Sequence, residues 1–181
     1  MLAWYRKLFS APQADPTAET AVDPQDANLQ AQNNQGVLHC LGAGVPQAFA
    51  SGMECFRQAA EQGHALAQNN LALMYSLGLG MPKDSEQASK WFLRSARQGD
   101  AAAQYHLGLK FHRASMGSLS AESHEAQIEA FKWLQLAADQ GYWKADTSRE
   151  RVNLEMDHAS VAEAQRRVAA FVSCKEASPL D

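Results

Sequence analysis

The chain has 181 residues, and its 16 Lys and Arg against 20 Asp and Glu give a formal net charge of −4. This length suits one ordinary domain or a short array of repeats. The slightly acidic balance argues against a protein that grips a phosphate backbone, so we expect no nucleic-acid partner. Cys40, Cys55 and Cys174 are too few, and odd in number, for a disulfide framework. We therefore expect reduced thiols and a cytoplasmic protein.

Residues 1–25 are predicted to form a short amphipathic segment and a flexible linker ahead of the folded body. The opening stretch MLAWYRKLFS lacks the continuous apolar run of a secretory signal. No stretch of the chain approaches the ~20 apolar residues that cross a bilayer, so we expect no integral membrane segment. Residues 1–9 could make a peripheral contact with a membrane, bind a partner or pack on the protein itself. Proline, alanine and acids then predominate, which is typical of a linker.

An internal repeat of 36 residues organises most of the remaining chain. Gly63 and Gly99 are 36 residues apart, and an Ala-Gln pair recurs at the same interval, starting at residues 31, 67 and 103. The next equivalent glycine, Gly141, follows after 42 residues. The six additional residues fall in or near RASMGSLSAESH, which we expect to lengthen a loop. The spacing therefore predicts three repeats, each a helix, a loop and a helix.

Both helices of each repeat carry a stripe of residues at helical spacing. In the middle repeat the stripe of the first helix comprises Ala67, Leu71, Ala72 and Tyr75. The stripe of the second helix comprises Ala88, Trp91, Phe92 and Ala96. Such spacing places each set on one side of its helix, where it can pack. The small residue in the first stripe, alanine or glycine, lets a neighbouring helix come close.

Glycines and prolines mark where these helices end. Gly63 and Gly99 follow the second helix of their repeats, where a left-handed residue ends a helix at little cost. The stretch GLGMP, residues 78–82, makes the turn inside the middle repeat. Asp84, three residues before Gln87, resembles a capping box for the helix that follows.

The repeat as a whole resembles the Sel-one-like repeat (SLR) family, a relative of the tetratricopeptide repeat proteins. The middle copy, ALAQNNLALMYSLGLGMPKDSEQASKWFLRSARQG, carries the resemblance almost throughout, and the resemblance extends over residues 27–145. It implies an all-α fold, a right-handed α-α superhelical solenoid of about three SLR repeats. It also implies a role in assembling protein complexes, and it implies no activity.

A solenoid over residues 26–172 needs a C-terminal cap, because its last repeat would otherwise expose an apolar face. A final helix over residues 158–172 is predicted to be this capping helix. Its apolar stripe comprises Val161, Ala164, Val168 and Phe171. Ser160 with Glu163 offers it a capping box. Residues 173–181 are predicted to form a disordered tail.

Residue patterns that carry chemistry are sparse. The six histidines form no H-x-x-x-H or H-E-x-x-H spacing and no His/Cys cluster with metal spacing. We find no nucleophile motif, and only His112, near the long loop of the third repeat, leaves an enzyme hypothesis open. We therefore expect a non-enzymatic protein with no catalytic residues, no metal and no cofactor.

A partner-binding surface is predicted on the side of the first helices opposite their packing stripe. In a stacked array these helices line the inner curve, so this side should face a concave groove. The predicted groove residues are Asn33, Val37, Cys40, Leu66, Asn69, Asn70, Leu73, Ser76, Leu77, Tyr105, Leu109 and His112. Amides, an aromatic ring and aliphatic groups together suit an extended or helical peptide. Alternatively, asparagines such as Asn34 and Asn70 satisfy neighbouring backbone groups at the loops.

The favoured function is thus a protein-interaction module, an adaptor or scaffold that holds a segment of a protein partner in its groove. The alternative is a regulatory adaptor that residues 1–9 either tether to a membrane or plug from within. The identity of the partner and the oligomeric state are left open by the sequence.

Overall fold

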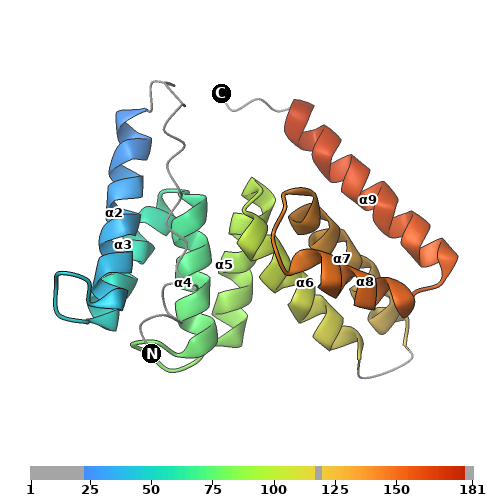
Figure 1. The fold of residues 1–181 in the computed structure, drawn as a ribbon, viewed down its shortest axis with the longest axis horizontal. Coiled ribbons are helices and arrows are strands. Elements are labelled where there is room, and N and C mark those ends of the chain that lie inside the picture. The colour runs from blue at the N-terminus through green and yellow to red at the C-terminus, as the bar shows by residue number, and fades with distance from the viewer. Residues whose placement is uncertain (1–22, 117–119, 178–181) are drawn as a thin grey trace. The chain divides into compact units, whose positions relative to one another are not determined.

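The protein is described by a computed structural model over residues 23–116 and 120–177. Within these residues the chain forms eight helices and no strand (Figure 1), which confirms the predicted all-α class. The helices are α2 (Pro24–Leu41), α3 (Phe49–Glu61), α4 (Ala65–Leu77), α5 (Ser85–Gln98), α6 (Ala101–Ser115), α7 (Ala121–Asp139), α8 (Ala145–Leu154) and α9 (His158–Ala177). Residues 1–22, which include the predicted amphipathic segment and most of the linker, lie outside the described residues.

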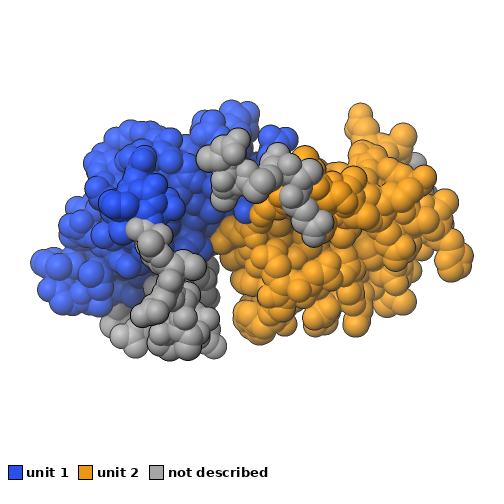
Figure 2. Space-filling view, turned by 90° about the horizontal axis from the view of Figure 1, so that it is seen from above, with its two compact units in different colours: residues 1–98 blue, residues 99–181 orange. Residues whose placement is uncertain are grey.

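The chain divides into two compact units, Met1–Gln98 and Gly99–Asp181, which Figure 2 colours separately. In the first unit α2 packs on α3 and α4 packs on α5, and α3 also contacts α4. In the second unit α6 packs on α7, which also contacts α8 and α9. Each predicted repeat is therefore one helical hairpin.

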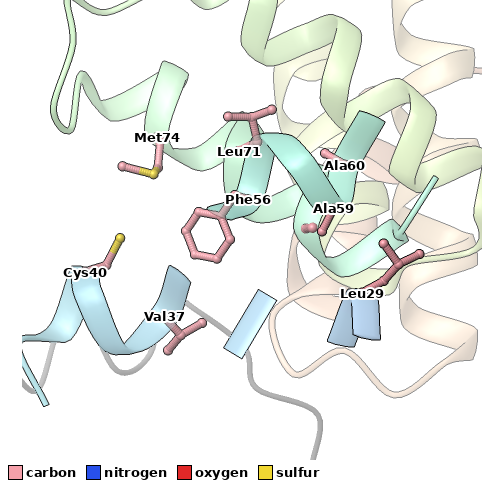
Figure 3. Packing of buried hydrophobic residues seen from close by; sticks show 9 residues of the cluster. Leu29, Val37, Cys40, Phe56, Ala59, Ala60, Leu71 and Met74 are labelled. Carbon is pink, nitrogen blue, oxygen red and sulfur yellow. The ribbon is translucent and has the colours of Figure 1, made fainter. Parts of the chain in front are cut away.

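The core of the first unit is built around Phe56, a second-helix residue with 0% of its surface exposed. Figure 3 shows its ring among Val37 and Cys40 of α2 and Leu71 and Met74 of α4. Trp91 of the predicted second-helix stripe and Trp133, which stands 42 residues later at the same repeat position, also pack in the interior. Trp91 lies partly buried against this cluster, and Trp133 is buried in the second unit.

Glycine brings the two helices of a hairpin into close contact. A Cβ atom on Gly36 of α2 would lie 2.6 Å from the Phe56 ring, and one on Gly108 of α6 would lie 2.7 Å from Cγ of Leu134. Phe56 and Leu134 hold the same repeat position in α3 and α7. The prediction that the small stripe residue admits a neighbouring helix is confirmed at both places.

We expect Gly108→Ala to lower the free energy of unfolding by about 1 to 2 kcal/mol. The methyl group would overpack the contact with Leu134, and the higher helix propensity of alanine would offset only part of that cost. Urea denaturation followed by circular dichroism measures the change. The double variant Gly108→Ala, Leu134→Ala should lose less stability than the two single losses combined. Additive losses, or a stabilised single variant, would contradict the close contact.

The helix ends follow the predicted chemistry with one exception. Gly63 and Gly99 have φ values of 99° and 98°, in the left-handed region. Oδ1 of Asp84 accepts hydrogen bonds from the backbone N–H of Glu86 and Gln87, both at 2.9 Å, so the predicted cap is confirmed.

The exception is the start of α9, where the predicted capping box of Ser160 with Glu163 is wrong. Asp157 caps this helix instead, because its Oδ1 accepts a hydrogen bond of 2.8 Å from the backbone N–H of Ser160. An aspartate three residues earlier competes successfully with the serine, since both are good N-cap residues.

The six additional residues of the third repeat lengthen a helix, so the prediction of a longer loop is wrong. α7 begins at Ala121, whereas the start of α5 at Ser85 would map 42 residues on, to position 127. Ser120 caps α7 by accepting a hydrogen bond from the backbone N–H of Ser123. The stretch AESHEA that follows contains no helix breaker, so it continues as helix.

This additional part of α7 helps to hold α9. Glu125 pairs with Arg167 of α9, which also contacts Glu129 at 3.0 Å and Glu163 at 2.9 Å. The guanidinium group of Arg167 lowers the pKa of the Glu125 carboxyl group. The rings of Trp133 and Phe171 meet edge to face, with centroids 5.5 Å apart. The apolar stripe of the predicted capping helix therefore faces α7, and the helix extends beyond the predicted end at residue 172.

Candidate functional site

The predicted groove residues differ in how much of each is accessible. The buried ones are Asn33, Val37, Cys40, Asn69, Asn70, Leu73, Tyr105 and His112. The half-buried ones are Leu66, Ser76 and Leu109. Leu77 is 41% exposed. A partner approaching the first helices would therefore meet only part of the predicted set directly.

Several of the buried members pack within their own units. Val37 and Cys40 belong to the cluster around Phe56, and burial raises the pKa of the Cys40 thiol to about 12. That thiol stays protonated at neutral pH and is a poor nucleophile. Tyr105 stacks at a tilt on Tyr142, with ring centroids 5.0 Å apart.

Three buried asparagines lie where α2 and α4 meet, namely Asn33 on α2 and Asn69 and Asn70 on α4, which we call the asparagine cluster. Each has at most 1% of its surface exposed. Nδ2 of Asn70 donates a hydrogen bond of 2.9 Å to Oδ1 of Asn33. Among the described residues, Nδ2 of Asn33, Oδ1 of Asn70 and both polar atoms of Asn69 have no hydrogen-bond partner.

Unmet polar groups of this kind are unusual in a folded protein. Leaving a buried donor or acceptor unpaired costs about 1 to 3 kcal/mol each, and native interiors contain few such groups. None of the three amides is bonded to a loop backbone group within the described parts of the chain. The asparagine cluster therefore holds four buried polar atoms that the described residues leave without a hydrogen-bond partner.

A second set of amides, which the sequence reasoning missed, joins the two helices of a hairpin. Nε2 of Gln98 donates to Oε1 of Gln68 at 2.7 Å, and Nε2 of Gln140 donates to Oε1 of Gln104 at 2.8 Å. The signal was present in the sequence, because both partners recur with the repeat. One is the glutamine of the Ala-Gln pair, and the other directly precedes the repeat-ending glycine.

One serine, histidine and aspartate contact deserves comparison with a catalytic triad. Nε2 of His124 hydrogen-bonds Oγ of Ser160 and lies 3.5 Å from Oδ2 of Asp157. In a triad the acid binds the ring nitrogen that does not face the serine, whereas here one nitrogen faces both groups. Asp157 also caps α9. These residues therefore link the start of α7 to the start of α9 and lack the geometry of a nucleophilic site.

The remaining polar features give no indication of a metal site. Nδ1 of His112 lies 3.8 Å from Oε2 of Glu155. These are only two side chains of the kind that bind metal ions. Among the described residues, no group of three or more histidine, cysteine or acidic side chains is placed to hold a metal ion. None of the helices described is long and apolar enough to cross a membrane.

A pocket of about 340 Å³ lies in the second unit beside the C-terminal half of α9. It is lined by Gly99, Gln104, Leu136, Asp139, Gln140, Phe171, Val172 and Lys175. Several of its polar groups are already paired, since Gln140 donates to Gln104 and Asp139 accepts from Gln135. The lining therefore does not specify the chemistry of a ligand.

Comparison with known proteins agrees with the hairpins described above. The sequence matches the Sel1 repeat over residues 29–64, 65–100 and 101–142. A Sel1 repeat protein from Oxalobacter formigenes, of solved structure, is 30% identical with a TM-score of 0.58, over 70% of this chain and 92% of that chain.

A second solved structure is more distant in sequence. The protective antigen c5321 of uropathogenic Escherichia coli, which displays an SLR fold, is 19% identical with a TM-score of 0.58. The match covers 99% of this chain and 44% of that chain, so this chain spans less than half of the antigen. No curated protein matches the sequence. The predicted solenoid fold with three repeats is confirmed.

Proposed function

Because the chain belongs to the Sel1 repeat family, we propose that it is a non-enzymatic adaptor or scaffold that binds a segment of a partner protein. Sel1 repeat proteins generally mediate protein–protein interactions. The binding surface that we propose is one side of α4, defined by Leu66, Asn69, Asn70, Leu73, Ser76 and Leu77 and called here the α4 face.

The observation that carries this proposal is that Leu66, Ser76 and Leu77 of the α4 face stay accessible in part, next to the unmet amides of the same helix. α4, with the sequence ALAQNNLALMYSL, contains no charged residue. Such a helix offers little to a phosphate backbone or to another highly charged ligand. Apolar side chains with a few placed polar groups are typical of surfaces that bind peptide segments.

The free thiols support a cytoplasmic location for this activity. Cys40, Cys55 and Cys174 are all unpaired, which is the usual state of cysteine in a reducing compartment. The partner would accordingly be another protein of the same compartment.

Peptides selected from a random display library on the full chain provide the test. We expect selected peptides whose affinity falls at least about tenfold in Leu77→Glu, equal to about 1.4 kcal/mol, because this substitution places a charge on the exposed part of the α4 face. Leu38→Glu is the matched control, since Leu38 is 44% exposed and lies outside that face. Failure to select any peptide, or equal affinity of the two variants, would refute the proposal.

A further inference from the structure

We propose that residues 1–9 dock, within the same chain, on the exposed side of α2 and cover it as the helix of a further repeat would. This side is defined by Ala31, Asn34, Gln35 and Leu38 and is called here the α2 outer face. It is a different surface from the α4 face, and the inference does not depend on the proposed function.

The α2 outer face is the side of a first helix on which a preceding repeat stacks. Its equivalents 36 residues later in α4 are the four buried residues Ala67, Asn70, Leu71 and Met74. Three of these belong to the core cluster around Phe56 of α3, and Figure 3 shows Leu71 and Met74 beside that ring. The matched repeats begin at residue 29, so no matched repeat precedes α2. All four residues of the α2 outer face are exposed.

The opposite side of α2 is already packed, so the α2 outer face is the side left for a further contact. The buried residues of this helix are Leu29, Asn33, Gly36, Val37 and Cys40, and at helical spacing they lie away from the α2 outer face. The α2 outer face contains no charged residue, and its Leu38 is 44% exposed. Residues 31 to 38 of a helix span about 10 Å. An uncharged strip of this length suits a short amphipathic helix.

The residues directly ahead of α2 are unsuited to cover the α2 outer face. In α3 the residues that share the core cluster with α4 include Phe56, Ala59 and Ala60. The residues 36 positions earlier are Thr20, Asp23 and Pro24. Two polar residues and a proline supply no apolar stripe, so the apolar side chains must come from elsewhere.

Residues 1–9 carry the required stripe. At helical spacing their large apolar side chains fall on one side, and these are Leu2, Trp4, Tyr5, Leu8 and Phe9. Ala3, Arg6 and Lys7 fall on the other side. A helix of nine residues is about 13 Å long, which matches the length of the α2 outer face. Docked in this way, the segment would bury its apolar side and keep both cations in solvent.

The length of the intervening chain favours a contact within one molecule. The predicted linker from residue 10 to residue 22 has 13 residues, and a flexible chain of this length has a root-mean-square reach of about 20 Å. Pro24 and Leu38 are 14 residues apart on α2, which corresponds to about 21 Å. The effective concentration of a tethered segment is highest when the reach matches the span, so docking in the same chain is favoured over docking on a second copy.

The charge of this region disfavours a membrane surface as the alternative. Attraction to anionic lipids grows with the number of basic residues close to the surface. Residues 1–28 contain only two basic residues, Arg6 and Lys7. Four acidic residues follow within the same range, namely Asp15, Glu19, Asp23 and Asp26. The acids would oppose binding to an anionic lipid surface.

The experiment compares ¹H–¹⁵N spectra of the full wild-type chain with those of Leu8→Glu and of the matched control Ala3→Glu. Both substitutions add one negative charge, but only the first places it on the apolar side of the segment. We expect the backbone amide resonances of Ala31, Gln35 and Leu38 to shift in Leu8→Glu and to stay unchanged in Ala3→Glu. The wild-type chain should also show nuclear Overhauser contacts between the Trp4 ring and the Leu38 methyl groups.

The other outcomes overturn the inference in recognisable ways. Resonances of the α2 outer face that are the same in all three proteins would mean that residues 1–9 do not dock there. Contacts that disappear on dilution would mean that a second copy supplies the segment. Absent contacts, with sedimentation on vesicles of equal parts phosphatidylcholine and phosphatidylglycerol that Leu8→Glu abolishes, would mean that the segment is a membrane anchor. Release of so short a segment is a local opening, so Leu8→Glu should unfold in urea almost as the wild-type chain does.

Discussion

Phe56→Ala should lower the free energy of unfolding by about 3 to 5 kcal/mol, the largest loss expected from a single substitution in the first unit. The ring is fully buried and fills the space between α2, α3 and α4. Gly36 of α2, which faces the ring at close distance, carries no side chain that could occupy the vacated volume. A cavity would therefore remain, and its lining would lose its dispersion contacts.

Urea denaturation followed by tryptophan fluorescence measures this loss, because Trp91 packs beside the same cluster. Leu38→Ala is the control, and its exposed side chain should cost less than about 0.5 kcal/mol. A loss below about 1 kcal/mol in Phe56→Ala would show that the three helices do not share this core.

The second large effect is a loss of stability in acid that depends on His106. Burial, and secondly the nearby cation of Lys144, lower the pKa of His106 to about 4, from an ordinary value of 6.5. The unfolded chain then binds a proton at a higher pH than the folded chain does. The stability that the folded state gains by keeping this ring neutral is fully present above pH 6.5, and it is lost as the pH falls towards 4.

Between pH 7.5 and pH 4.5 this one group should remove about 2 to 3 kcal/mol of stability. His106→Asn should reduce the acid sensitivity by that amount, and asparagine is the residue that the first two repeats carry at the equivalent positions 34 and 70. His158→Asn, at an exposed histidine, is the control. Asp100 has the opposite effect on stability in acid, because burial raises its pKa. The effect of His106 is therefore measured as the difference in acid sensitivity between the variant and the wild-type chain. Equal acid sensitivity of the wild-type chain, His106→Asn and His158→Asn would contradict the role of His106.

The hairpins could be predicted because they depend on local and repeated features. Gly63 and Gly99 mark turns, and the residue at position 36, 72 or 108 must be small for two helices to touch. These constraints act within one repeat and recur at the same positions of the next repeat. The spacing of glycines and small residues in the sequence is therefore enough to predict the hairpins. The extension of α7 was missed because the whole polar stretch RASMGSLSAESH was interpreted as a loop, although its last part, AESH, contains no residue that stops a helix.

The burial of Asn69, Asn70 and Leu73 within the α4 face could also have been anticipated. The prediction assumed that a helix has one packed side and one open side, as an amphipathic surface helix does. α4, however, contacts both α3 and α5, and a helix without charges is typical of such a buried position. The unmet amides of Asn33 and Asn69 could not be predicted, because only coordinates show which polar groups find partners.

The backbone amide resonances of Leu66, Ser76 and Leu77, assigned in a ¹⁵N-labelled full chain, test the central claim most directly. These resonances should shift as a selected peptide reaches saturation, whereas the resonance of Leu38, which is exposed outside the α4 face, should stay unchanged. Saturating binding that moves none of the resonances of the α4 face would contradict the claim that this face holds the partner.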